Sequence, residues 1–446
     1  MAKLDLEKKM ILALVEAVRL SERIKPSQDA KRRAFSKYGY LGSPRDPLLT
    51  AIFYGIMKRL GILDIIIKDL VGVDPYVLDP WLRSALRVLL EIRFYRDPSK
   101  RTLKYLRNSV AKLLSSKTHP YVGMYYTRLY DRIINTNYKY IPSSMEKEVF
   151  EYMLPKWYID RIKQLMSEEA DKLLKSLDQQ LPLSVRVNTL KTTVEYVIKE
   201  LRKQVKWVKQ SRVIPTVLKF PGPFNFEKSK LWRKGLIIIQ EEAAAIASIL
   251  LAPEPGMTVV DLAAAPGGKT EHMAELMKNN GIIYAFDIND KRIQRMKEIL
   301  RRTGIEIVKI MKQDARKAPD VLGEEIADRV LLDAPCSSDG TIMKNPDLRW
   351  RLREEKVYEL QSLQIEMLEA GWKLLKKGGR ILYCTCSMLR EENEDIISMF
   401  LERHKGEAKL VPLKKPYDPG FLPGTMRAFP HRHKTIGFFY ALIEKV

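Results

Sequence analysis

The chain has 446 residues, of which 46% are hydrophobic, so it is too long for one typical domain and can bury more than one core. A net charge of +23 is large for a merely solubilising surface and favours nucleic acid as a partner. Three cysteines cannot form a disulfide framework, and no apolar run is long enough to span a membrane. We therefore expect a cytoplasmic protein with no membrane contact.

The positive charge is concentrated in the first half of the chain. Residues 1–150 carry +13, residues 151–240 carry +9 and residues 241–446 carry only +1. A basic N-terminal region and a nearly neutral C-terminal region predict a polyanion-binding part of the chain joined to a part with a different function. These boundaries define the three domains that we expect.

Residues 1–150 are predicted to be helical. The stretches LEKKMILALVEAVRLSERI and DPWLRSALRVLLEIRFYRD repeat apolar residues at three- and four-residue spacing, with basic residues on the other side. Asp79 followed by Pro80 predicts a helix start. The stretch IPSSMEKEVFEYMLPKWY indicates a hinge and a new helix, because Ser143 and Glu146 have capping-box spacing.

Residues 151–240 contain a small α/β segment. LPLSVRVNTLK and VKWVKQSRVIPTVLKF alternate apolar with polar residues, and TTVEYVIKELRKQ lies between them as a helix. The exposed positions of this segment are basic. Arg186 and Asn188 alternate along its first strand, and contact with RNA or with solvent is open for both.

After residue 241, strands and helices alternate, which is typical of a doubly wound, Rossmann-like α/β sheet. We expect strands at 257–262, 281–287, 305–310, 328–333, 379–384 and 437–443. We expect helices near 269–278, 290–302, 355–375 and 391–404.

The stretch MTVVDLAAAPGGKTEHMAEL predicts a ligand loop between the strand ending in Asp261 and the next helix. Its small side chains let a ligand lie on the backbone, and the helix N-terminus offers amide donors. The loop is neither a G-x-G-x-x-G fingerprint nor a P-loop. The candidate cofactor-binding residues are Ala263, Ala264, Ala265, Pro266, Gly267, Gly268 and Lys269. Lys269 has three open roles: contact with a target phosphate, contact with a cofactor carboxylate, or capping of a surface helix.

Acidic residues follow the next strands and should meet at the same crevice. Asp287, nineteen residues after Gly268, suits a ribose diol. Asp314 is placed to accept from the exocyclic amine of adenine, and Asp333 ends the fourth strand. An adenosine ligand without a phosphate cradle indicates S-adenosylmethionine rather than NAD or ATP.

The three cysteines lie near the ends of apolar runs. The five histidines show no ligand spacing with them, so we predict no metal. Cys384 lies within an apolar run and is predicted to be buried core. Cys386, at the end of that strand, would turn out to face the crevice together with Cys336. The HRH stretch at 431–433 can approach an RNA backbone, but a solvated loop is the favoured interpretation.

Several motifs in order resemble the Fmu/Sun family of RNA cytosine carbon-5 methyltransferases. They are DLAAAPGGKT, DAPCSSDGT followed by NPDLRW, YCTCSM followed by EENED, and the closing MRAFPHRHKTIGFFYALIEK. The resemblance covers residues 150–446, including a small RRM-like segment, and residues 1–150 are similar to a NusB-like RNA-binding domain. Ala263 departs from the family, which often has cysteine there.

The resemblance implies that Cys386 adds to carbon 6 of cytosine, Cys336 assists product release and Asp333 hydrogen-bonds the cytosine ring nitrogen or amine. In DNA cytosine methyltransferases the Pro-Cys thiol is the nucleophile, so these roles depend on the family match. The implied product is 5-methylcytosine in RNA, with rRNA favoured over tRNA and a monomer expected. DNA as substrate, a non-catalytic RNA-binding or ribosome-assembly factor, and a small-molecule methyltransferase remain as alternatives.

Overall fold

The computed structural model describes residues 3–135, 143 and 146–446. The chain divides into two compact units, one made of Met1–Asp160 with Asn345–Leu352 and the other of Arg161–Lys344 with Arg353–Val446. The division into three domains at 150 and 240 stays a prediction. Among the described residues, no helix is both long and apolar enough to cross a bilayer.

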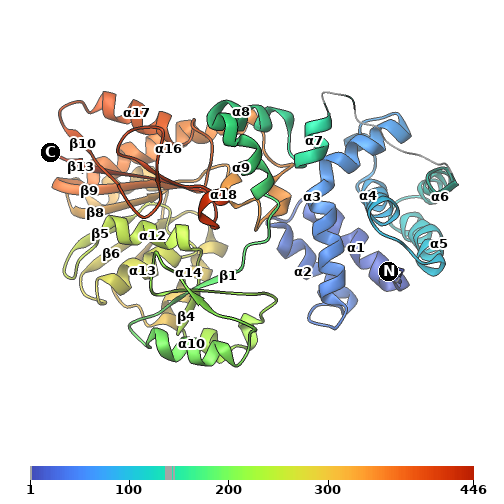
Figure 1. The fold of residues 1–446 in the computed structure, drawn as a ribbon, viewed down its shortest axis with the longest axis horizontal. Helices are drawn as coiled ribbons and strands as arrows, with labels where there is room; N and C mark the ends of the chain where they lie inside the picture. Colours follow the sequence, from blue (N-terminus) through green and yellow to red (C-terminus); the bar gives the residue numbers. More distant parts are fainter. Residues whose placement is uncertain (1–2, 136–142, 144–145) are drawn as a thin grey trace. The chain divides into compact units, whose positions relative to one another are not determined.

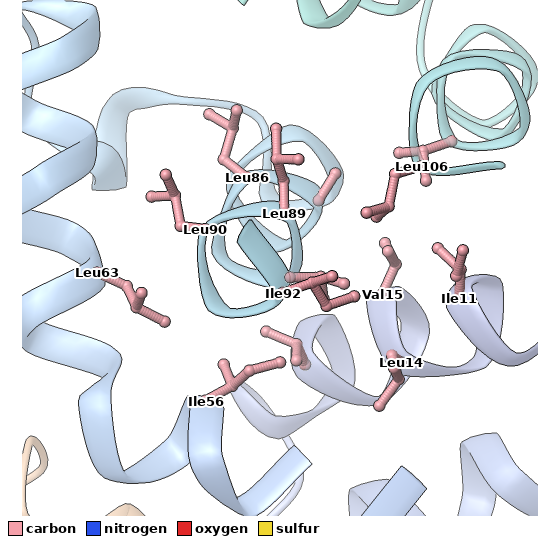
Figure 2. Close-up of a cluster of buried hydrophobic side chains, with 14 of the residues drawn as sticks. Ile11, Leu14, Val15, Ile56, Leu63, Leu86, Leu89, Leu90, Ile92 and Leu106 are labelled. Carbon is pink, nitrogen blue, oxygen red and sulfur yellow. The ribbon is translucent and has the colours of Figure 1, made fainter. Parts of the chain in front are cut away.

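The first unit is helical, which confirms the expectation for residues 1–150. Its helices are α1 Lys8–Ser21, α2 Ser27–Tyr38, α3 Asp46–Val71, α4 Pro80–Tyr95, α5 Lys100–Lys117, α6 Pro120–Asn135 and α7 Lys147–Tyr152. The next helix, α8 Lys156–Met166, contains the boundary between the units. Figure 2 shows the core, in which Val15 of α1, Ile56 of α3 and Ile92 of α4 lie near one another.

The predicted helix starts of this unit are confirmed. The Asp79 side chain accepts from the backbone N–H groups of Trp81 and Leu82, which satisfies two donors at the start of α4. Ser143 and Glu146 form the reciprocal bonds of a capping box just before α7. The hinge expected immediately before α7 lies partly outside the described residues.

The basic side of α4 is buried as well as its apolar side. Arg87 is fully buried and bonds to Glu22 and Asp64, each at 2.7 Å, and Arg83 bonds to Glu22 at 2.7 Å. Part of the positive charge of this unit is therefore neutralised inside it. Only the exposed remainder can attract a polyanion.

Residues Asn345–Leu352 belong to the helical unit, although the chain on both sides of them belongs to the second unit. They follow the segment that contains Cys336. The Trp350 indole N–H donates to the Lys58 carbonyl of α3 at 2.8 Å. Arg349 is fully buried, and its guanidinium donates to the Tyr152 carbonyl at 2.9 Å. Gly61 of α3 makes room for the indole, since an added Cβ would lie 2.1 Å from the Trp350 ring.

Gly61→Ala is expected to destabilise the helical unit, although alanine normally stabilises a helix interior by about 0.5–1 kcal/mol relative to glycine. Overpacking against the anchored indole should cost about 1–3 kcal/mol. Urea unfolding followed by helical circular dichroism measures the change. In a Trp350→Ala background the same substitution should become neutral or stabilising, and an equal loss in both backgrounds would contradict the packing argument.

The second unit begins with a small antiparallel sheet in the order β2-β3-β1-β4, which confirms the predicted α/β segment. Its elements are β1 Leu183–Val187, α10 Val194–Arg202, β2 Lys209–Gln210, β3 Val217–Phe220, α11 Lys230–Arg233 and β4 Ile237–Ile239. One face of the sheet buries Val185 and Leu218 against Val197 and Leu201 of α10. The alternation of apolar and polar residues in β1 and β3 supplies this face.

The larger sheet of this unit has the order β11-β12-β13-β9-β8-β5-β6-β7, with β10 paired to β13 (Figure 1). Its strands are β5 Thr258–Asp261, β6 Ile282–Asp287, β7 Val308–Lys312, β8 Ala327–Asp333, β9 Leu375–Thr385, β10 Ala408–Val411, β11 Asp418–Pro419, β12 Met426–Ala428 and β13 Phe438–Lys445. Its main helices are α12 Glu242–Leu251, α13 Gly268–Leu276, α14 Asp290–Thr303, α15 Ala318–Leu322, α16 Glu354–Leu374 and α17 Glu394–Arg403. Every strand and helix predicted after residue 241 is therefore present.

Helices cover both faces of this sheet, as in a doubly wound fold. Residues of α12, α13 and α14 pack into one core cluster, and residues of α15, α16 and α17 pack into another. Strands β5, β6, β7, β8 and β9 are parallel, so their carboxyl ends meet at one edge. The strand order reverses at β5, between β6 and β8, and such a switch point is where open α/β sheets bind ligands.

Candidate active site

The loop between β5 and α13 lies at this switch point, and space beside its backbone is found at Gly268. Gly267 has a φ of 103°, and an added Cβ there would lie 2.8 Å from the Met296 side chain. A Cβ at Gly268 would meet nothing closer than 3.7 Å, so there is open space beside the first turn of α13. The first N–H groups of a helix have no partner within it and can bind an anionic group.

Asp261 and Asp287 end β5 and β6, but their surroundings differ. Asp261 is buried and accepts from the Thr270 hydroxyl at 2.8 Å, and burial raises its pKa to about 7. Its carboxyl therefore holds the start of α13 and does not line an open space. Asp287 accepts from the Asn289 N–H at 2.8 Å and lies 3.3 Å from the Arg292 guanidinium. The Asp287 side chain is also buried, and its contact with a ribose diol stays a prediction.

Asp314 follows β7, where it begins the short helix η4 Ala315–Lys317 by accepting from the Arg316 N–H at 3.0 Å. The Arg316 guanidinium also pairs with this carboxylate at 2.6 Å, and the hydrogen bond to Arg316 lowers the pKa of Asp314. The residue is ionised at the carboxyl edge of the sheet. Contact with adenine stays a prediction.

Lys269 and Asp333 form the charged centre of the site. The Lys269 ammonium lies 2.6 Å from Asp333 at the end of β8, so the alternative of a surface helix cap is wrong. Burial opposes protonation of Lys269, but Asp333 and the thiols of Cys384 and Cys386 outweigh it and raise the lysine pKa. Lys269 is therefore a fixed positive charge close to the thiols. A nearby cation favours a thiolate over a thiol.

Cys336 and Cys386 come together from separate strand ends, with their sulfur atoms 3.5 Å apart. The expectation that they face the same place is confirmed. The hydrogen bond with Cys386, followed by burial, raises the pKa of Cys336 well above its ordinary value. Cys336 therefore keeps its proton at neutral pH.

Cys384 is fully buried, as predicted, but it also has a polar contact that the sequence did not indicate. Its S–H donates to Asp333 at 3.6 Å, and burial raises its pKa well above the ordinary value. Among the described residues, no group of three or more His, Cys, Asp or Glu side chains could hold a metal ion.

A buried polar cluster behind the two thiols was missed by sequence reasoning. The Glu392 carboxylate accepts from the Ser337 N–H at 2.9 Å and from the Ser337 hydroxyl at 2.5 Å. The Gly340 N–H donates to the Cys386 carbonyl at 2.9 Å, and a Cβ on Gly340 would lie 2.8 Å from that oxygen. These bonds fix the two cysteine segments against each other. The run EENED at residues 391–395, a few residues after the apolar strand, was the available signal, because polar side chains that become buried need hydrogen-bond partners.

Glu392→Gln is expected to remove one component of the pH dependence of stability. Burial raises the pKa of Glu392 from 4.5 to about 7, so the folded chain holds an extra proton between these values. The contribution of this group to the free energy of unfolding is fully present below pH 4.5. It falls by up to about 3 kcal/mol as the pH rises from 4.5 through 7. Denaturant unfolding of both proteins from pH 5 to pH 8 measures the difference, and parallel pH curves would contradict this assignment.

The expectation for Arg186 and Asn188 needs correction. Arg186 and Asn188 face neither RNA nor solvent, since both are fully buried. Arg186 pairs with Glu271 and Glu275 of α13, and the Asn188 amide donates to the Thr303 carbonyl at 3.0 Å. The alternation along β1 was read correctly, but this sheet is covered on the side where those residues lie.

The HRH stretch is not a solvated loop. It forms most of the short helix α18 Pro430–His433. His431 lies 3.1 Å from Glu169, and Arg432 pairs with Asp418 at 2.5 Å. These side chains hold the chain segments of their own unit together. Their approach to an RNA backbone stays untested.

The residues at the edge of the sheet fit S-adenosylmethionine. The open backbone at Gly268, the amide donors of α13 and the oriented Asp287 carboxylate match the amino acid and ribose parts of that molecule. The parallel sheet with its switch point at β5 and helices on both faces is the fold of S-adenosylmethionine-dependent methyltransferases. A solved structure described as NSun6 from Pyrococcus horikoshii with SFG is similar over 66% of this chain and 98% of that one, with 27% identity and a TM-score of 0.61.

Residues 248–444 match the family described as 16S rRNA methyltransferase RsmB/F, and residues 154–227 match the ferredoxin-like domain of RsmF/B-like methyltransferases. Ribosomal RNA small subunit methyltransferase B of Serratia proteamaculans is 33% identical over 295 residues, which are 66% of this chain and 67% of that protein. The chain belongs to the RsmB/F family, which confirms the resemblance seen in the motifs. The crystal structure of PH0851 covers 100% of both chains with 55% identity and a TM-score of 0.94.

Proposed function

We propose that this protein transfers a methyl group from S-adenosylmethionine to carbon 5 of cytosine in RNA, with rRNA as the substrate. The observation that carries the proposal is the pair of free thiols 3.5 Å apart, next to the Lys269–Asp333 pair at the ligand-binding edge of the sheet. Family membership supports rRNA as the polymer.

Two thiols suit this chemistry because carbon 5 of cytosine is a poor nucleophile on its own. Addition of the Cys386 thiolate to carbon 6 makes carbon 5 electron-rich, and a carboxyl or ammonium group at the pyrimidine edge stabilises the charge that develops. Asp333 and Lys269 are the groups available for that task. When bound, S-adenosylmethionine supplies the methyl group.

Release of the product requires a second step. A base must take the proton from carbon 5, and the electron pair of that bond re-forms the double bond between carbons 5 and 6. The bond between carbon 6 and the Cys386 sulfur breaks at the same time, which returns its electron pair to that sulfur. We assign assistance in this elimination to Cys336, because its sulfur lies 3.5 Å from that of Cys386. Glu392 and Gly340 hold the two segments at this separation.

Incubation of the full chain with methyl-labelled S-adenosylmethionine and total RNA tests the proposal. Nuclease digestion and mass spectrometry should identify 5-methylcytidine, with label in the rRNA fraction. DNA of matched sequence and the RNA-free reaction are the controls. Label in DNA, in tRNA alone, or in a product formed without RNA would overturn the assigned substrate, and a methylated base other than 5-methylcytosine would overturn the chemistry.

A further inference from the structure

The α5 and α6 helices carry an exposed basic surface of the helical unit. Residues 100–135 contain eight lysines and arginines and a single acidic residue, Asp131. That carboxylate is already paired with Arg107 at 2.8 Å. The surface of this helix pair is therefore positive, which favours a polyanion.

Large side chains are exposed on the same helices. The exposed fractions are 72% for Tyr121, 55% for Met124 and 41% for Tyr125. They follow one another at three- and four-residue spacing with Arg128, so they share one side of α6. The Tyr121 ring stacks on the His119 ring, with centroids 5.1 Å apart and planes 20° apart. This stack is already formed in the protein, so less ordering is needed when another flat ring packs on it.

A groove of about 430 Å³ runs between the two helices beside these side chains. Lys112 of α5 and Met124 of α6 are among its lining residues, and its floor is made of small side chains. Gly123 permits this close packing, since an added Cβ would lie 2.5 Å from the Ala111 carbonyl. The groove thus has a cation on one wall and apolar surface on the other.

We propose that this face, defined by Lys112, Tyr121, Met124, Tyr125 and Arg128, docks a single-stranded segment of the RNA substrate. Aromatic rings interleaved with cations match the stacked bases and the phosphates of a single strand. A protein partner would need a larger continuous apolar area than these three side chains supply. The inference rests on the proposed RNA substrate and assigns it a second binding surface, separate from the thiols.

Binding of the full chain to a fluorescein-labelled oligocytidine RNA, followed by anisotropy over a series of salt concentrations, tests the cations. Lys112→Gln with Arg128→Gln should lower the slope of log affinity against log salt by about 1.4, since each lost contact with single-stranded phosphate contributes about 0.7. Arg23→Gln with Arg33→Gln is the matched control, because both residues are exposed arginines elsewhere in the unit. Its slope should be that of the unchanged protein.

The tyrosines are tested at fixed salt. Tyr121→Ala with Tyr125→Ala should weaken RNA binding by about tenfold or more without changing the slope, whereas the two Phe substitutions should preserve affinity. If both pairs of variants bind RNA like the control, the face serves another partner and the proposal is overturned. Methyl transfer by the unchanged protein is measured separately. Loss of RNA affinity in these variants would uphold the docking face even if the product proved not to be 5-methylcytidine.

Discussion

Cys386→Ala is expected to abolish methyl transfer, with a fall of about 10⁴-fold or more, because the reaction then lacks the nucleophile that activates carbon 5. Cys336→Ala should instead accumulate a covalent protein–RNA adduct that survives a denaturing gel. The difference follows from the roles that the family resemblance assigns, since the two sulfur atoms lie 3.5 Å apart and this separation by itself does not distinguish them. Transfer of labelled methyl groups and the gel shift are measured on the same samples.

Cys384→Ala is the matched control for these variants. It removes the third thiol, on β9 two residues before Cys386, but this thiol is fully buried and bonded to Asp333. We expect its activity to fall by less than about tenfold, through a small change at Asp333. An adduct in Cys386→Ala and none in Cys336→Ala would exchange the assigned roles. Full activity in both would remove the thiols from the mechanism.

Arg186→Met is expected to destabilise the second unit by about 3–5 kcal/mol, because it leaves the buried carboxylates of Glu271 and Glu275 without their cation. Burial already raises the pKa of Glu271 to about 7 even with Arg186 present. Since Glu271 and Glu275 lie on α13, the loss should loosen the helix that begins beside the cofactor loop. Hydrogen–deuterium exchange of the α13 amides, measured by mass spectrometry, reports this local change.

The triple variant Arg186→Met, Glu271→Gln and Glu275→Gln separates charge from packing. Removing all three charges together should recover most of the lost stability, since a buried ion network contributes little compared with neutral groups of similar size. Exchange in α13 should then return toward the rate of the unchanged protein. Equal destabilisation in the single and triple variants would show that side-chain packing, rather than an unpaired charge, holds β1 to α13.

Local patterns in the sequence predicted much of the fold. Periodicity alone indicated β5 through β9, α13, α14 and α16, because one face of each element must be apolar to pack. The same reasoning missed the short edge strands β10, β11 and β12. Strands of two to four residues carry too few side chains for a period to show. β10 and β12 form by pairing with β13, and β11 forms by pairing with β12.

Alternation along a strand cannot tell which of its two faces will be covered. The pattern of β1 placed Arg186 and Asn188 on one side of the strand. Their partners on that side are side chains of α13 and the Thr303 carbonyl, which lie about 80 to 115 positions further along the chain. The same limit applies to α4, where Arg83 and Arg87 are buried by Glu22 and Asp64. A charged residue is buried only when a partner from elsewhere in the chain neutralises it.

The sequence by itself determined the class of the protein, because the small-residue loop after β5, the acids at successive strand ends and the Pro-Cys and Thr-Cys pairs are all local features. The tertiary structure decided which groups meet. The parallel pairing of β8 with β9 brings Cys336 to within 3.5 Å of Cys386 across fifty residues, and the parallel pairing of β5 with β8 sets Lys269 on Asp333. Short contacts between distant residues arise from how the strands are ordered and registered, and no period along the chain encodes that order.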